Sequence, residues 1–313
     1  MRILFFGTSG ISRVFLESLY IDNHILFSLT RLDKGSFRGQ KLNPPAVKIF
    51  SIEKNIPFLQ VDSFTGEIFE EVKSFKPDLG ISVSFGKIIP EYIFNLPRLK
   101  TINIHFSLLP KYRGASPVQY SIINGEKETG VCSFFIEKNL DSGDIITLRK
   151  SAIDFKDTSE TLFQKLTPLG IETMRETIEL LQDKNFKPKK QTGEIIYAPL
   201  LKKEDGHINW NGESLNIYNR IRGLYPWPGA FSIILNKNAI QKRLKIIESE
   251  IADYAPQNEK NGAVFEVKKG KGFFVKCGKG ALLIKTVQPE NKPKMSAWDF
   301  IMGRQIFVGG ILS

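Results

Sequence analysis

The chain has 313 residues, of which 42% are hydrophobic, and its formal net charge at pH 7 is +11. This length predicts about two domains, each large enough to bury its own core. The sequence has no apolar run of the roughly 18 residues that cross a bilayer, and its amino terminus reads as a strand entering a glycine turn, which predicts a soluble, unprocessed protein with no membrane partner.

Cysteine content and the distribution of charge along the chain indicate the protein's location and the kind of partner it binds. Cys132 and Cys277 are the only cysteines and lack metal-type spacing, so neither a disulfide framework nor a zinc site is implied, and a cytoplasmic location is predicted. Residues 1–205 carry 28 basic and 25 acidic groups, whereas residues 206–313 carry 16 and 8. The excess in the second part indicates a polyanion partner, although a lysine-rich solvated surface would give the same pattern.

Four short β-rich segments in the first part of the chain are separated by stretches compatible with helices. They cover residues 2–6, 25–30, 79–85 and 100–106. This alternation predicts an α/β fold in which a Rossmann-like, mostly parallel sheet is covered by helices on both faces. In such a sheet ligands bind beyond the carboxyl ends of the strands, so the residues that follow positions 6, 30, 85 and 104 are candidates for a site.

The turn after the first segment contains Gly7 and Gly10. It is similar to the start of a dinucleotide-binding turn but lacks a third glycine in register. We therefore expect no nicotinamide cofactor.

The rest of the chain is predicted to contain a long helix, a linker and a barrel. Apolar residues at near-helical spacing predict a core-facing helix within residues 158–184. Residues 186–205 are polar, basic and proline-bearing and read as a linker between a catalytic domain at 1–185 and a second domain at 206–313. In the second domain a helix over 213–224 precedes short strands with glycine turns, which predicts a small OB-like β-barrel.

Asn103, His105 and Ser107 alternate along NIHFSLLPKYRGA, where a predicted strand runs into a basic, glycine-bearing turn. A period of two places their side chains on one face at the end of the strand. An amide that donates to a developing oxyanion and an imidazole that titrates near neutral pH suit acyl transfer. A packed histidine satisfied by backbone groups would give the same pattern, and the residues alone leave both interpretations open.

Asp141 and Asp144 flank a Ser-Gly bend in NLDSGD, where small polar residues commonly do no more than form the turn. Taken together, however, these stretches resemble the formyltransferase family that uses 10-formyltetrahydrofolate. The resemblance is carried by NIHFSLLPKYRGASPVQ, INGEKETGV and the LDSGD turn, and it continues through YAPLLKKEDGHINW and GLYPWPGAF over nearly the whole chain. Two departures are GTSGIS, where relatives more often have a proline and a phenylalanine, and RGQKL, where a fuller basic run is common.

The resemblance implies that Asn103, His105 and Asp141 are catalytic. Asn103 would hold the negative oxygen that forms when an amine attacks the formyl group, a contribution of roughly 3 to 4 kcal/mol. His105 would stabilise the same charge or carry a proton, and Asp141 would orient the imidazole and help to accept the amine proton. Which of the last two is the final base stays open, and no metal is expected.

The resemblance also places 10-formyltetrahydrofolate beside two turns. The predicted binding residues are Phe85, Gly86, Lys87, Ile88, Ser107, Leu108, Leu109 and Pro110. Gly86 would allow a flat ring to approach closely, although an ordinary strand-to-helix turn accounts for the first four residues equally well.

The formyl acceptor implied by the resemblance is the α-amino group of initiator methionyl-tRNA. The loop RLDKGSFRGQKL would bind the tRNA through Arg31, Lys34, Arg38 and Lys41, with Phe37 between them. Cations and an aromatic ring suit phosphates and an unstacked acceptor end, although such loops are often only solvated. The basic barrel would follow the RNA backbone. We expect no stable protein partner, and therefore a monomer.

Other functions share parts of this pattern. A formyltransferase acting on a nucleotide amino sugar, or a 10-formyltetrahydrofolate hydrolase, would use the same Asn, His and Asp. The RGASPVQ continuation, the long basic loop and the basic barrel favour tRNA over both. A non-enzymatic RNA-binding module is disfavoured because the three candidate catalytic residues are intact.

Overall fold

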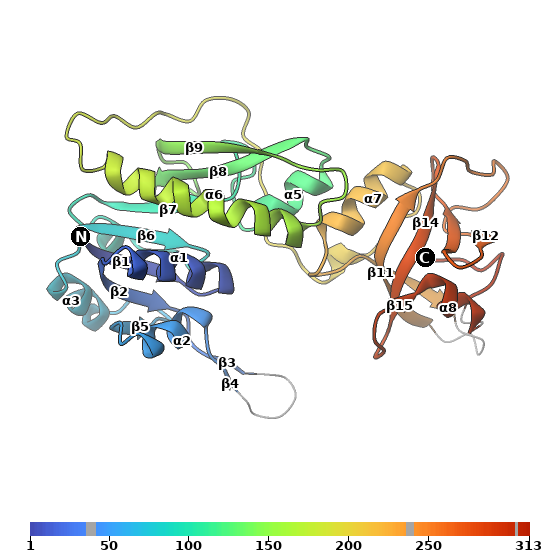
Figure 1. Cartoon of the computed structure of the whole chain (residues 1–313), viewed down its shortest axis with the longest axis horizontal. Coiled ribbons are helices and arrows are strands. Elements are labelled where there is room, and N and C mark those ends of the chain that lie inside the picture. Colours follow the sequence, from blue (N-terminus) through green and yellow to red (C-terminus); the bar gives the residue numbers. More distant parts are fainter. Residues whose placement is uncertain (36–41, 236–240, 304–305) are drawn as a thin grey trace. The chain divides into compact units, whose positions relative to one another are not determined.

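Figure 1 shows the computed structural model of the chain, coloured from the amino to the carboxyl terminus. The structure describes residues 1–35, 42–235, 241–303 and 306–313. Their contacts divide the chain into two compact units. The N-terminal unit comprises residues 1–117, 129–151 and 165–198, and the C-terminal unit comprises residues 118–128, 152–164 and 199–313.

The N-terminal unit is built on a sheet with the strand order β5-β2-β1-β6-β7-β8-β9. The strands are β1 (Arg2–Gly7), β2 (Ile25–Thr30), β5 (Phe58–Gln60), β6 (Leu79–Val83), β7 (Thr101–His105), β8 (Glu128–Phe135) and β9 (Ile145–Ala152). From β5 to β7 the neighbouring strands run parallel, and β8 is antiparallel to β7. The predicted Rossmann-like sheet is confirmed.

Helices cover both faces of this sheet, and the alternating side chains of β1 pack against different helices on the two faces. Leu4 and Phe6 of β1 pack in one cluster with Val72 of α3 (Gly66–Ser74) and Ile93 of α4 (Glu91–Phe94). The other face of β1, which includes Phe5, meets α1 (Gly10–Ile21), and α1 also packs on α2 (Ala46–Glu53). α6 (Ser159–Leu180) lies within the range predicted for the long helix.

The C-terminal unit contains an antiparallel sheet with the order β10-β11-β14-β13-β12, and β15 pairs with β14. Its strands are β10 (Phe231–Leu235), β11 (Gln241–Ile251), β12 (Val264–Lys268), β13 (Gly272–Lys276), β14 (Ala281–Pro289) and β15 (Met295–Ser296). The chain end bridges the two edge strands. Ser313 exchanges backbone hydrogen bonds with Ile233 of β10, and Gly309 and Gly310 bond to Val264 of β12. The predicted barrel-like domain is confirmed.

The helices of the C-terminal unit come from distant parts of the chain. They are α5 (Pro117–Ile123), α7 (Ser214–Gly223), α8 (Ala297–Met302) and the short η1 (Glu204–Gly206). The hydroxyl of Tyr218 on α7 donates to the carbonyl of Phe155 at 2.9 Å, and their rings stack with centroids 4.9 Å apart. Arg222 on the same helix donates to the carbonyl oxygens of Asp154 and Asp157. Segment 152–164 is therefore part of this unit's packing.

In the described ranges, no helix is long and apolar enough to cross a membrane.

Candidate active site

His105 ends β7 at the carboxyl edge of the parallel strands and is buried, with 5% of its surface exposed. Its Nε2 lies 2.9 Å from the carbonyl oxygen of Tyr112, and its Nδ1 lies 3.9 Å from Oδ2 of Asp141. Because a carbonyl oxygen only accepts, Nε2 is the donor in this contact. Nδ1 is then the ring atom that faces the carboxylate.

Asp141 is fixed by its backbone and by a network of hydrogen bonds. Its φ of 46° lies in the left-handed region, and its Oδ2 accepts from the backbone N–H of Gly114 at 2.7 Å. Gln191 donates to the carbonyl oxygens of Asp141 and Gly143 at 2.9 and 2.8 Å. Arg113 in turn donates to Oε1 of Gln191. The bend therefore does more than turn the chain, because it holds a carboxylate beside His105.

Gly114, Arg113 and Gln191 were not among the predicted site residues. Gln191 belongs to the segment interpreted as a linker, yet that segment is bound to the N-terminal unit by backbone bonds between Lys189 and Ile145 and between Arg113 and Ala198. No local pattern marks a glutamine that braces a turn 50 residues upstream.

Gly143 makes the close packing of the Asp141 turn possible. A Cβ at this position would lie 1.8 Å from the carbonyl oxygen of Phe135, which no side chain tolerates. The LDSGD turn therefore needs glycine at this position to lie against the end of β8.

Asn103 precedes His105 by two residues on β7 and is half-buried. Its backbone is paired with Ser82 of β6 and Phe134 of β8. Within the described part of the chain, its side-chain amide makes no hydrogen bond. The amide is therefore a donor that the described protein groups do not use and that is available to a developing oxyanion.

The SLLP turn lies directly after His105. Ser107 is buried and its hydroxyl donates to the carbonyl of Lys111 at 2.7 Å, so it shapes the turn. Leu109 packs against Cys132 and Phe134, while Leu108 is half-buried. Pro110 completes the buried part of the turn. Burial raises the pKa of the Cys132 thiol to about 12, so this cysteine is a neutral packing group near the site.

The turn after β6 holds the other predicted folate residues. Phe85 is buried against Phe6, and its carbonyl accepts from the hydroxyl of Thr8 at 2.8 Å, which ties this turn to the one after β1. Gly86 has a φ of 76°, and a Cβ there would lie 3.3 Å from Nη1 of Arg31. Lys87 forms an ion pair of 2.8 Å with Asp62, whereas Ile88 is 91% exposed.

The predicted tRNA-binding residues separate into two groups. Arg31 lies beside Gly86, and Lys34 is exposed on the short ribbon formed by β3 (Lys34–Gly35) and β4 (Leu42–Asn43). Arg38, Lys41 and Phe37 lie outside the described residues.

A hydrogen-bonded ring holds the base of the basic loop. Lys48 on α2 donates to both carboxylate oxygens of Asp33, at 2.9 and 2.8 Å, and to Oε1 of Gln60 at 2.8 Å. Gln60 on β5 donates to Asp33 at 2.6 Å and to the carbonyl of Arg31 at 3.1 Å. Hydrogen bonds from Lys48 and Gln60 lower the pKa of Asp33. The ring joins the residues before the loop to the helix after it.

In the part of the chain that the structure describes, no group of three or more His, Cys, Asp or Glu side chains has the geometry to hold a metal ion.

Comparison with known proteins matches residues 1–178 to the family described as Formyl transferase and residues 200–305 to the family described as Formyl transferase, C-terminal domain. A protein of Endomicrobium trichonymphae named methionyl-tRNA formyltransferase is 48% identical over 99% of both chains. One of the same name from Thermodesulfovibrio yellowstonii is 40% identical over 98% of this chain and 97% of its own.

Among solved structures, the N-formyltransferase of Helicobacter canadensis, in complex with folinic acid and dTDP-3-aminofucose, has a TM-score of 0.66 at 23% identity. It covers 92% of this chain and 98% of its own. This likeness shows a common fold.

Proposed function

Because the chain belongs to the formyl transferase family, we propose that it transfers the formyl group of 10-formyltetrahydrofolate to the α-amino group of methionyl-tRNA, the step that prepares the initiator for translation. The observation that carries the proposal is the meeting of Asn103, His105 and Asp141 at one end of the sheet. The acceptor is supported by the two relatives of that name, which match this chain over nearly its full length.

The residues after β6 and after β7 fit the co-substrate. Gly86 leaves room for a flat ring at a left-handed turn, and Ile88 offers an exposed apolar side chain. 10-Formyltetrahydrofolate supplies the activated formyl carbon when it is bound. We propose that Phe85 to Ile88 and Ser107 to Pro110 line its site.

The chemistry that this chain supplies follows from two side chains of β7. We propose that the amide of Asn103 donates to the formyl oxygen as negative charge develops on it. His105 keeps Nε2 bonded to the Tyr112 carbonyl, so its Nδ1 is the atom that exchanges a proton. Asp141, held by the N–H of Gly114, stabilises the protonated imidazole and helps to receive the proton lost by the attacking amine. The same pair can return a proton to the tetrahydrofolate nitrogen when the bond from that nitrogen to the formyl carbon breaks.

For the tRNA, we propose that Arg31, Lys34, Arg38 and Lys41 contact the acceptor end. Lys34 is exposed, and the ring of Lys48, Asp33 and Gln60 holds the base of this loop. We further propose that the protein acts in the cytoplasm as a monomer. Gel filtration with light scattering tests the oligomeric state.

One assay tests the function. The protein is incubated with 10-formyltetrahydrofolate labelled in its formyl group, together with methionyl-tRNA and a nucleotide amino sugar as competing acceptors. We expect label on the methionyl amine at a rate that far exceeds label on the sugar. Label on the sugar, or release of formate without transfer, would replace the proposed acceptor with sugar or water respectively.

A further inference from the structure

Arg113 lies between the two residues whose main-chain groups hold the imidazole and the carboxylate of the site. The residue before it, Tyr112, provides the carbonyl oxygen that accepts from Nε2 of His105 at 2.9 Å. The residue after it, Gly114, provides the N–H that donates to Oδ2 of Asp141 at 2.7 Å. The position of the Arg113 backbone therefore determines where both side chains are held.

The backbone of Arg113 is itself fixed by the segment that precedes residue 199. Its N–H donates to the carbonyl of Ile196 at 2.9 Å, and its carbonyl accepts from the N–H of Ala198 at 2.7 Å, in a parallel bridge. Gly114 has a φ of 125°, and a Cβ there would lie 2.5 Å from the carbonyl oxygen of Ala198. The segment is therefore packed directly against the main chain that holds the site.

The side chain of Arg113 reaches the same segment at Gln191, which is half-buried. Its Nε and Nη2 donate to Oε1 of Gln191, at 3.2 and 2.7 Å. The amide nitrogen of Gln191 in turn donates to the carbonyl oxygens of Asp141 and Gly143. This arrangement needs an amide, because a carboxylate would accept from the guanidinium but could not donate to the two carbonyl groups.

The turn that carries Asp141 needs this support because its backbone has an uncommon conformation. Asp141 has a φ of 46°, and a residue with a side chain stays in this left-handed region when its surroundings fix it. Its Oδ2 lies 3.9 Å from Nδ1 of His105, which is about 1 Å beyond hydrogen-bonding distance. A small displacement of the turn therefore decides whether the carboxylate reaches the imidazole.

We propose that Gln191 and Arg113 are positioning residues, which act through Asp141 and hold its carboxylate where it assists His105. This inference rests on the proposed function for the identity of the reaction. Gln191 acts on the turn through main-chain carbonyl groups. Its loss therefore lowers the rate of the chemical step and leaves the binding of substrates nearly unchanged.

Steady-state kinetics of the full-length protein with 10-formyltetrahydrofolate and methionyl-tRNA test the proposal. Gln191→Ala should lower kcat about 10- to 100-fold and change both KM values by less than about twofold. Gln191→Glu should cause a similar loss, because its carboxylate cannot donate to the carbonyl groups of the turn. An unchanged kcat in either variant would overturn the proposal.

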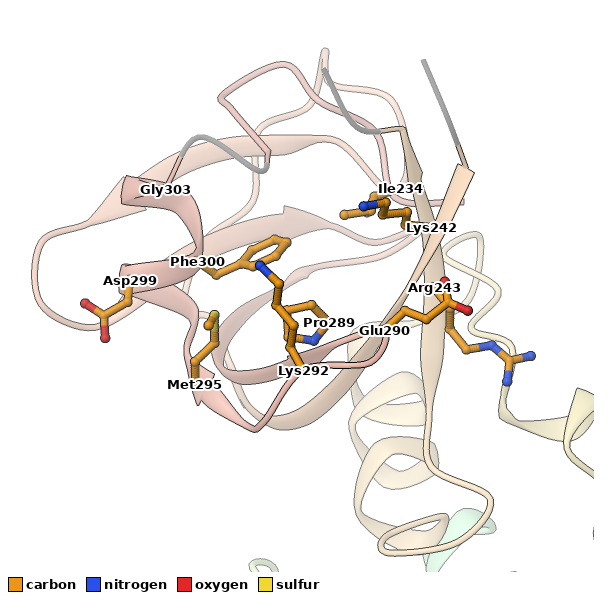
Figure 2. A pocket seen from close by; sticks show the side chains of 10 residues that line it. All are labelled: Ile234, Lys242, Arg243, Pro289, Glu290, Lys292, Met295, Asp299, Phe300 and Gly303. Atoms are coloured by element: carbon orange, nitrogen blue, oxygen red, sulfur yellow. The ribbon is translucent and has the colours of Figure 1, made fainter. Parts of the chain in front are cut away.

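Gln288 offers a matched control in the C-terminal unit. It is half-buried like Gln191, and its amide donates to the carbonyl of Lys292 at 3.0 Å. Figure 2 shows Lys292 among the residues that line a cavity of about 210 Å³ in this unit. Gln288→Ala removes a bond of the same kind away from the catalytic side chains, so kcat should change by less than about twofold.

A double-mutant cycle separates positioning from a general loss of stability. If Gln191 acts through Asp141, Gln191→Ala should lower the single-turnover rate by less than about twofold in a protein that already carries Asp141→Asn. Losses that multiply in the double variant would show that Gln191 acts independently of Asp141, and the proposal would be wrong.

Hydrogen exchange of the Gly114 amide, measured by NMR, gives a reading that needs no substrate. Gln191→Ala should raise its exchange rate at least about tenfold, because the Asp141 carboxylate that accepts from it becomes mobile. Unchanged protection would contradict the proposal. If Gln191→Ala fails to fold in a thermal melt, Gln191→Met replaces it, since this side chain keeps the length and loses the hydrogen bonds.

The two proposals fail in different ways. A protein whose Gly114 amide loses protection in Gln191→Ala, but which transfers no formyl group to methionyl-tRNA, would refute the proposed function and support the positioning role. Formyl transfer that is unaffected by Gln191→Ala would support the proposed function and refute the positioning role.

Discussion

At the scale of single residues, the two ring nitrogens of His105 contact different groups. Nε2 bonds to a main-chain carbonyl and fixes the ring, while Nδ1 faces a carboxylate that is itself fixed by the N–H of Gly114. Asn103 contributes an amide from the same strand. We therefore expect the three residues to affect the chemical step and not RNA binding.

Replacing Asn103 by Ala should lower kcat for formyl transfer about 100- to 1000-fold, because an oxyanion donor is lost. His105→Ala should cause a loss of several orders of magnitude. Asp144→Asn is a suitable control, since this residue belongs to the same turn but has no side-chain contact with His105 among the described groups. Steady-state kinetics and tRNA binding are measured for all three variants. Full activity of the Asn103→Ala or the His105→Ala protein would contradict the assignment.

The two thiols allow a prediction about pH. Burial raises the pKa of both Cys132 and Cys277 to about 12. The folded state therefore favours the neutral thiols, and their contribution to stability is complete below the ordinary thiol pKa of about 9 and is lost as the pH rises from there toward 12. In the folded protein both cysteines should resist a thiol reagent at about pH 8 and should react on unfolding.

The same contribution can be isolated by comparison with Cys132→Ala. Other groups titrate in alkaline solution, so the useful quantity is the difference between the two proteins' free energies of unfolding. This difference should shrink between about pH 8 and pH 10.5, and a difference independent of pH would contradict the assigned pKa.

The sequence could predict Asn103 and His105 as partners because a period of two brings them to one face. It could not by itself connect Asp141 to them, because that contact joins residues 36 positions apart in the chain. Only the family resemblance made that link. Gly114 and Gln191 contribute a backbone N–H and a bracing amide, which have no residue-type signature.

At the scale of elements, the ring of Lys48, Asp33 and Gln60 joins the segment after β2 to α2 and β5 around the start of the basic loop. The β3–β4 ribbon provides a second tie between the two sides of that loop. Both devices hold the described ends of the loop in place, which would lower the entropy lost if the loop binds tRNA as proposed.

Asp33→Ala should therefore raise KM for methionyl-tRNA several-fold, with kcat changed by less than about twofold. Asp22→Ala is the matched control, since it removes a carboxylate that binds Arg175 elsewhere in the same unit. Asp33→Glu should restore part of the affinity. Equal effects of the Asp33 and Asp22 substitutions on KM would indicate general destabilisation instead of loop positioning.

Element types were predictable where the apolar pattern is strong, as in the strand at Arg2–Gly7 and the helix at Ser159–Leu180. The pairing of the chain end with the two edge strands of the barrel was not predictable. Residues 309–313 have no strand pattern, and their pairing with Ile233 and Val264 depends on where the two edge strands end in space. Contacts of this kind are set by tertiary packing and leave no local trace.

At the scale of the whole molecule, the chain passes repeatedly between its two units. Residues 118–128 and 152–164 group with the C-terminal unit, although residues on both sides of them belong to the N-terminal unit. Gly223 on α7 shows how tightly α5 packs there, because a Cβ at Gly223 would lie 2.8 Å from the Ile123 side chain. The domain limits predicted at residues 185 and 206 are not tested by this division into units and stay predictions.

A fragment of residues 206–313 should consequently be much less stable than the same region in the full chain. It would lose the Phe155 ring that stacks on Tyr218 and the carbonyl groups that bind the buried Arg222. In the full chain, Arg222→Ala should lower the free energy of unfolding by about 2 kcal/mol. Lys279→Ala, at an exposed ion pair, should change it by less than about 0.5 kcal/mol.

Urea titrations followed by circular dichroism measure both effects. A fragment with the unfolding midpoint of the intact protein would show that residues 118–128 and 152–164 add nothing to the barrel's stability.

The shared packing of α5, segment 152–164 and α7 also limits how such proteins recombine. In a chimera of two relatives joined at residue 205, α7 would come from one protein and α5 from the other. The contact surfaces of the two helices would then not be complementary. Hybrids that exchange the barrel together with residues 118–128 and 152–164 keep their interlocking partners. Among related proteins, substitutions in α5 should therefore be accompanied by compensating substitutions in α7.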